Sequence, residues 1–76
     1  MIDSLLAEMR HQGLRVAVHN DYCQDGRLYT FWLMTYDAVE FGVLAFKGEA
    51  ETDEEALQKI RRSFHSTMQR LAEKRS

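Results

Sequence analysis

The chain has 76 residues and a mass of 8.9 kDa, which allows one small domain over residues 1–76 and no second core. It is 45% hydrophobic and 29% charged, a balance that excludes an intrinsically disordered chain. Its 10 basic and 12 acidic side chains give a net charge of −2 at pH 7, which argues against a nucleic-acid binder that depends on a strong positive field. The single cysteine, Cys23, excludes an intramolecular disulfide and a multi-cysteine zinc site.

The sequence contains no apolar run near the ~20 residues that span a bilayer, and no basic segment followed by an apolar block at the N-terminus. We therefore expect a cytoplasmic protein with no membrane partner. A chain this short buries only about 60% of its unfolded surface, which favours stabilisation by oligomerisation.

The N-terminal segment predicts a short helix. Asp3 or Ser4 can cap it, and it runs to about Gln12, with Gly13 as its C-terminal stop. One apolar stripe along it consists of Leu5, Leu6 and Met9.

Three strands are expected next. Residues 14–22 alternate between apolar and polar side chains, which indicates a strand with one buried face. Asp25-Gly26 is a strong signal for a two-residue hairpin turn. Residues 27–36 are rich in aromatic and β-branched side chains and are predicted to form the central strand. A weaker turn over residues 37–40 leads to a third strand over 41–47.

Gly48 is expected to end the third strand, and a long helix follows. Thr52 and Glu55 form a capping box, in which each residue bonds the backbone amide of the other. Apolar residues then recur at helical spacing: Leu57, Ile60, Phe64, Met68 and Leu71. The expected fold class is α+β with the order α-β-β-β-α, a three-stranded antiparallel meander packed on one face by two helices.

The two turns set the strand register and therefore decide which side chains share a face. A two-residue loop at 25–26 places His19 opposite Trp32, and a four-residue loop over 37–40 places Trp32 opposite Ala45. The predicted core face contains Val16, Val18, Tyr29, Phe31, Leu33, Leu44 and Phe46. The predicted outer face contains Arg15, Ala17, His19, Thr30, Trp32, Met34, Tyr36, Phe41, Val43 and Ala45.

This outer face is too apolar for contact with water alone, and a patch of several hundred Å² at this scale marks a protein interface. We predict that Trp32 anchors it, because large aromatic residues dominate the centres of interfaces. Area is supplied by Met34, Tyr36, Phe41 and Val43, with His19 and Arg15 at the rim. Two alternatives stay open: the short helix covers this face, or the register is slipped.

Catalytic and metal motifs are sparse. His19, Asp21 and Cys23 alternate along one strand and offer ligand atoms, but such polar residues at a strand end are common, so we expect no metal and no cofactor. The sequence has no nucleophile motif and no glycine-rich phosphate loop, and we expect no enzymatic activity.

The order α-β-β-β-α resembles that of double-stranded-RNA-binding domains, and residues 46–56 resemble their approach to the last helix. Those domains carry lysines there, whereas this chain has Asp53, Glu54 and Glu55, so RNA binding does not carry over. Residues 51–57 are also similar to the strand-to-helix junction of HicB-type antitoxins.

A broader resemblance is to small uncharacterised proteins of tailed phages and prophages. It rests on the segments 16–22, 25–26, 30–35, 47–49 and 52–57. It implies a phage or prophage origin, and by analogy a protein that binds a host protein, as anti-CRISPR proteins do.

The sequence thus predicts a non-enzymatic protein-binding module that forms a homodimer through the outer sheet face and acts on a host protein. The alternative is a small nucleic-acid-binding or antitoxin-like regulatory domain, in which Trp32, Tyr36 and Phe41 stack on bases. Nucleic acid is disfavoured because Arg15 and Lys47 are the only basic residues we expect on that face.

Overall fold

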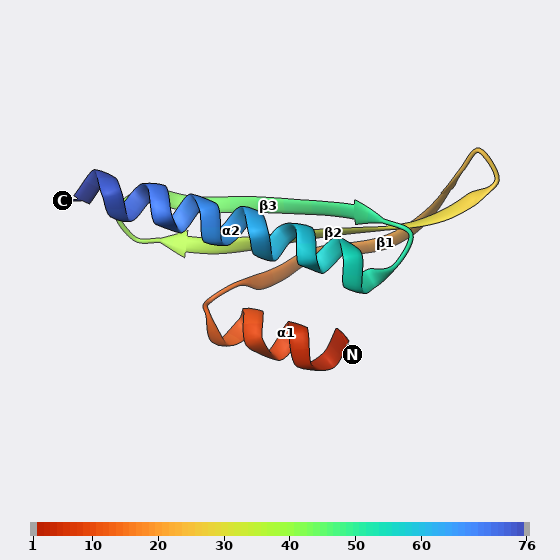
Figure 1. The fold of residues 1–76 in the computed structure, drawn as a ribbon, viewed down its shortest axis with the longest axis horizontal. Helices are drawn as coiled ribbons and strands as arrows, with labels where there is room; N and C mark the ends of the chain where they lie inside the picture. The colour runs from red at the N-terminus through yellow and green to blue at the C-terminus, as the bar shows by residue number, and fades with distance from the viewer. Residues whose placement is uncertain (1, 76) are drawn as a thin grey trace.

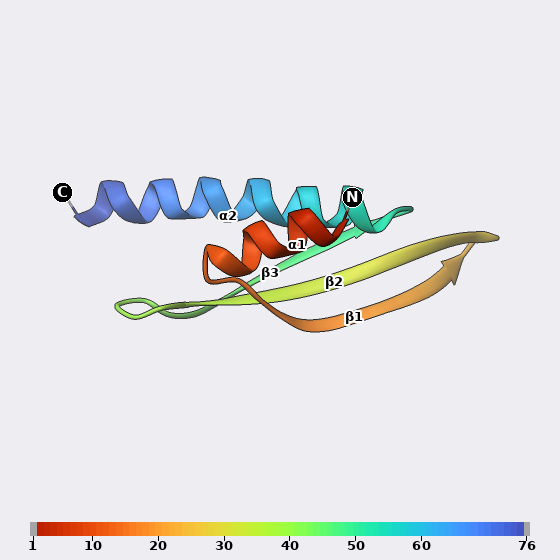
Figure 2. The same ribbon diagram turned by 90° about the horizontal axis from the view of Figure 1, so that it is seen from below.

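The computed structural model describes residues 2–75 (Figure 1). The elements are α1 (Ile2–His11), β1 (Arg15–Gln24), β2 (Arg27–Ala38), β3 (Gly42–Ala50) and α2 (Asp53–Arg75). The strands form an antiparallel sheet in the order β1-β2-β3. Both helices lie on the same side of this sheet (Figure 2). The predicted α+β fold with the order α-β-β-β-α is therefore confirmed.

The end of α1 is set by Gly13, as predicted. The Gly13 amide donates to the Arg10 carbonyl and the Leu14 amide donates to the Met9 carbonyl, both at 3.0 Å. This is the paired bonding of a Schellman motif, which needs a left-handed residue after the helix, and Gly13 has φ 102°. Met9 and Leu14 are both fully buried, so the motif also directs the chain into the core.

The β1–β2 hairpin also forms as predicted over its distal part. Asp25 and Gly26 both have positive φ (53° and 76°), the signature of a type I′ turn, and Gln24 pairs with Arg27. The register shifts between Val16 and Val18, where β1 carries one extra residue. The register that places His19 opposite Trp32 would, if it continued, place Ala17 opposite Met34. Because of this β-bulge Met34 pairs with Val16 instead, so that part of the predicted register is wrong.

The predicted register between β2 and β3 is wrong by three residues. Trp32 pairs with Gly48 rather than with Ala45. Ala38 pairs with Gly42, which has φ 83°. The strand begins at Gly42 and continues past Gly48 to Ala50. An odd shift reverses β3 relative to β2, so Leu44 and Phe46 share a side with Trp32 and Met34 rather than with Phe31 and Leu33.

The predicted core face is wrong for β2, because the helices cover the other side of that strand, but it is right for β3, where Phe46 is buried and Leu44 packs against the core. Trp32 and Met34 are 5% and 0% exposed. Val16 and Val18, expected in the core, are 37% and 41% exposed. The buried cluster consists of Leu5, Met9, Leu14, Trp32, Met34, Phe46, Ala50, Ala56, Leu57, Ile60 and Phe64.

Small residues let α2 lie close to the sheet. Gly48 faces Ala56, and a Cβ built on Gly48 would lie 2.2 Å from the Ala56 carbonyl oxygen. A glycine is therefore required where β3 passes beneath α2, and this explains why Gly48 lies within the strand instead of ending it.

Thr52 caps α2 as predicted: its Oγ1 accepts from the Glu55 amide at 3.2 Å.

The molecule is elongated. The last β2–β3 pair is Thr30 with Ala50, so residues 22–29 form a two-stranded arm that projects beyond β3 and the start of α2 (Figure 1). The radius of gyration is 13.4 Å, above the ~11 Å of a compact chain of this length. No helix within residues 2–75 is both long and apolar enough to cross a membrane.

Candidate functional site: the open face of the sheet

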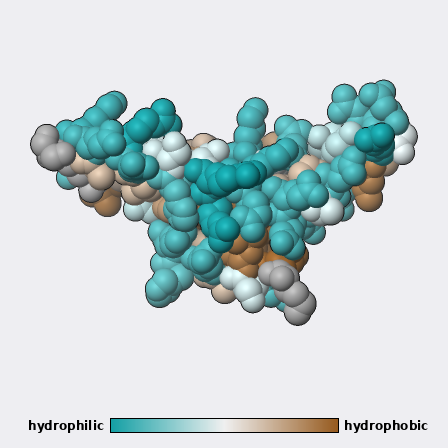
Figure 3. Space-filling model, in the orientation of Figure 1, coloured by the Kyte–Doolittle hydropathy of each residue, from teal (hydrophilic) through white to brown (hydrophobic). Residues whose placement is uncertain are grey.

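One side of the sheet carries no helix (Figure 2). We call this side the open face. It displays Val18, Tyr22, Tyr29, Phe31, Leu33, Val43, Ala45, Lys47 and Glu49, together with the polar residues Arg15, Asn20, Thr35 and Asp37. Phe31 and Leu33 are half-buried on the central strand, and Val43 on the edge strand is 70% exposed. By contrast, the surface over α2 on the helix-bearing side is largely hydrophilic (Figure 3).

Polar contacts organise the open face at its hairpin end. The Tyr22 hydroxyl donates a hydrogen bond to the Glu49 carboxylate, which links β1 to β3 across the central strand. Its ring stacks on Tyr29 with centroids 5.6 Å apart. This bond to an anion raises the pKa of Tyr22. Lys47 lies two residues from Glu49, so this edge of the face carries one charge of each sign.

The predicted interface residues do not come together. Trp32 and Met34 lie in the core, so they form no surface on the folded chain. Tyr36 is half-buried and meets Phe64 edge to face, with centroids 5.1 Å apart. The prediction that Trp32 anchors an exposed face is therefore wrong, because the helices pack on that side of the sheet.

The other predicted residues divide between three places. His19 is exposed on the helix-bearing side of β1 and stacks on the Trp32 ring with centroids 3.7 Å apart. Arg15 is exposed at the start of β1, where it pairs with Thr35 on the open face. Phe41 is 42% exposed in the β2–β3 turn. Of the seven, Val43 and Arg15 lie on the open face.

A polar cluster joins β1 and β2 to the first residue of α2. Asp53 Oδ1 accepts hydrogen bonds from Trp32 Nε1 at 3.0 Å and from Thr30 Oγ1 at 2.8 Å. His19 Nε2 lies 3.4 Å from the same oxygen. The bonds from Trp32 and Thr30, followed by the nearby imidazole of His19, hold the pKa of Asp53 below its usual value. Asp53 is thus a fixed anion at neutral pH.

Sequence reasoning missed both Asp53 and the open-face role of Phe31 and Leu33. One signal was present: Gly48 and Ala50 are small residues on one side of β3, as close packing by a helix requires. Another was Trp32, whose indole N–H needs an acceptor when the ring is buried. Asp53 supplies that acceptor.

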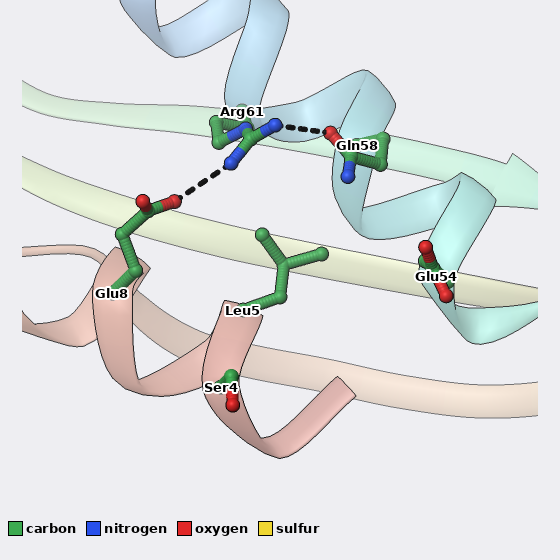
Figure 4. Close-up of a pocket in the computed structure, with 6 residues that line it drawn as sticks. All are labelled: Ser4, Leu5, Glu8, Glu54, Gln58 and Arg61. Atoms are coloured by element: carbon green, nitrogen blue, oxygen red, sulfur yellow. Dashed lines mark hydrogen bonds and ion pairs between the residues drawn. The ribbon is translucent and has the colours of Figure 1, made fainter. Parts of the chain in front are cut away.

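The two helices enclose a shallow cleft of about 250 Å³ (Figure 4). Arg61 crosses it, donating to Glu8 at 2.8 Å and to Gln58 at 2.7 Å. Leu5 projects between these polar side chains (Figure 4). Because Arg61 already has partners on both helices, the cleft is best explained as the junction that attaches α1 to α2.

Comparisons of the chain with protein-family models, with curated proteins and with solved structures find no match in any of the three. The resemblance to phage and prophage proteins remains a prediction from the sequence.

Proposed function

We propose that the protein is a non-catalytic binding module that associates with a second copy of itself through the open face. The observation that carries this proposal is the uncovered apolar surface around Leu33 and Phe31, in a chain whose two helices lie on the opposite side. Contiguous apolar surface of this kind typically marks an interface.

The exposed area of the chain supports association. The accessible surface is 5351 Å², while a folded monomer of this mass exposes about 4,800 Å². The excess agrees with the elongated shape. Covering the open face in a dimer would bring the area per chain back toward the value for a compact protein.

The size of the open face indicates a weak dimer. The 12 residues of β2 extend for roughly 40 Å, and neighbouring strands lie about 4.8 Å apart. These dimensions give on the order of 500 Å² on each copy. The two copies together would bury about 1,000 Å², which is the total area at which specific interfaces begin. We therefore expect dimerisation in the micromolar range.

The charges on β3 favour a second copy as the occupant. A two-fold interface requires a patch that complements itself. Lys47 pairs with Leu33 and Glu49 pairs with Phe31, so these charges lie in adjacent rows of the sheet. A two-fold axis that runs across the strands between these rows places Lys47 of each copy against Glu49 of the other. Single-stranded nucleic acid fits less well, because Glu49 would repel its phosphates.

The test is sedimentation equilibrium from about 5 to 500 μM. We expect the native chain to dimerise and Leu33→Glu to be monomeric, because a buried unpaired carboxylate is costly. Val43→Glu is the second variant: Val43 is 70% exposed on an edge strand, so its substitution leaves the core of the folded chain intact. Gln69→Glu, on the exposed side of α2, adds the same charge and should leave the dimer intact.

A native chain that stays monomeric to 500 μM would overturn the proposal, as would equal association of Leu33→Glu, Val43→Glu and the native chain. Tight binding of a single-stranded oligonucleotide to the native chain, lost in Val43→Glu, would assign the face to nucleic acid instead.

A further inference from the structure

Three residues with metal-ligand chemistry converge on the helix-bearing side of the sheet, away from the open face. His19 and Asp21 lie two residues apart on β1, and Asp53 begins α2. One ligand atom from each lies within 4.8 Å of the other two. His19 and Asp21 are exposed and Asp53 is half-buried, so an ion has access from solvent. The sequence placed Cys23 with His19 and Asp21, whereas the structure brings Asp53 into that group.

Two of the three side chains are already held in position. Asp53 Oδ1 receives bonds from Trp32 and Thr30, both at most 5% exposed, and Oδ2 takes part in neither bond. The His19 ring lies against the Trp32 ring at an interplanar angle of 14°. Metal sites depend on such outer contacts, because they fix the ligands before the ion arrives.

From this geometry we propose that His19, Asp21 and Asp53 bind a first-row transition-metal dication of the Zn²⁺ type. The donor set is one imidazole nitrogen and two carboxylates, and an imidazole favours such ions over Mg²⁺ and Ca²⁺, which prefer oxygen ligands. Three protein ligands leave the fourth tetrahedral position to water or to an external ligand. This inference is independent of the proposed function.

The distance between His19 and Asp53 fits a tetrahedral ion. Bonds of about 2.0–2.1 Å to zinc place neighbouring ligand atoms roughly 3.3 Å apart. His19 Nε2 and Asp53 Oδ1 are 3.4 Å apart, which is long for a good hydrogen bond but close to that edge. Asp21 is exposed on an edge strand, and its ligand atom lies within 4.8 Å of the other two.

The charges also favour a dication. The two carboxylates carry about −2 together, which outweighs the roughly +0.5 charge of the α2 N-terminus beside Asp53. A bound ion would attach β1, an edge strand, directly to α2. The ion would therefore hold the base of the projecting hairpin against the helical layer.

The experiment is a titration of tag-free, EDTA-treated protein with ZnCl₂, followed by calorimetry. All variants carry Cys23→Ser, because an exposed thiol competes for zinc. We expect one ion per chain, and no comparable binding of MgCl₂. Asp21→Asn and His19→Gln should each weaken zinc binding more than tenfold.

The matched control is Asp25→Asn. It removes the same charge from the same hairpin but lies outside the cluster, and asparagine tolerates its positive φ. Asp21 makes no bond to Trp32 or Thr30 in the cluster, so the apo protein with Asp21→Asn should keep the native melting temperature. The proposal fails if zinc binds more weakly than about 1 mM, or if Asp21→Asn and Asp25→Asn reduce the affinity equally.

Discussion

Replacing Gly48 with alanine tests the close approach of α2 to β3. The added Cβ would lie 2.2 Å from the Ala56 carbonyl oxygen, 3.0 Å from the Ala56 carbonyl carbon and 3.1 Å from Ile60 Cγ1. Ordinary contact begins near 3.4 Å, so the helix and the strand must separate by about 1 Å. Overpacking on this scale costs about 1–3 kcal/mol, and we expect the upper end because the obstructing atom belongs to the backbone.

The assay is urea unfolding followed by the fluorescence of Trp32, the single tryptophan, which is buried in the native state. With a urea dependence of about 1 kcal/mol per molar, a loss of about 3 kcal/mol lowers the midpoint by roughly 3 M. Ala45→Val adds carbon atoms to the open side of the same strand and should change stability by less than about 0.5 kcal/mol. A loss below about 0.5 kcal/mol for Gly48→Ala would refute the close approach.

Three further predictions follow from the cluster and the open face. Trp32→Phe removes the donor to Asp53 and leaves a void, so urea unfolding, followed here by circular dichroism because the variant has no tryptophan, should show a loss of about 2–4 kcal/mol. An unchanged midpoint would contradict the hydrogen bond. The pKa of Asp53 is lower in the folded protein than in the unfolded chain, so in EDTA its carboxylate stabilises the fold. This stabilisation is fully present above the pKa of the unfolded chain and is lost as the pH falls through the pKa of the folded protein. Asp53→Asn should therefore make the free energy of unfolding fall less steeply between pH 6 and pH 2. An equally steep fall in this variant would show that Asp53 is not its cause. Lys47→Glu and Glu49→Lys should each weaken the dimer in sedimentation, and the double exchange should restore it; a double variant as weak as the single ones would exclude the proposed axis.

The sequence predicts those features of the fold that depend on a few neighbouring residues. Gly13, Asp25-Gly26 and Thr52 act through positive φ or through unpaired amides at a helix end, and each appears where expected. Such signals need no knowledge of the rest of the chain. The element order and the distal β1–β2 register follow from them.

These local signals do not determine which side of the sheet faces the core. Both sides of β2 are apolar, with Trp32 and Met34 on one and Phe31 and Leu33 on the other. Hydrophobic pattern alone cannot decide between two such sides, and the turn between β2 and β3 has no strong signature. Packing decides, because the close approach of α2 requires a residue without a Cβ at Gly48. The candidate site inherited the same error, since an inverted central strand places Trp32 and Met34 in the core instead of on the surface.

The extra residue in β1 has a consequence for solubility. β1 is an edge strand of 10 residues, and the outer row of its backbone amides and carbonyls is a template on which another chain could add. A bulge increases local twist and interrupts the straight ladder that a foreign strand needs. The irregularity between Val16 and Val18 therefore protects this edge from fibre-like growth. Any self-recognition is thereby directed toward the flat of the sheet rather than along its border.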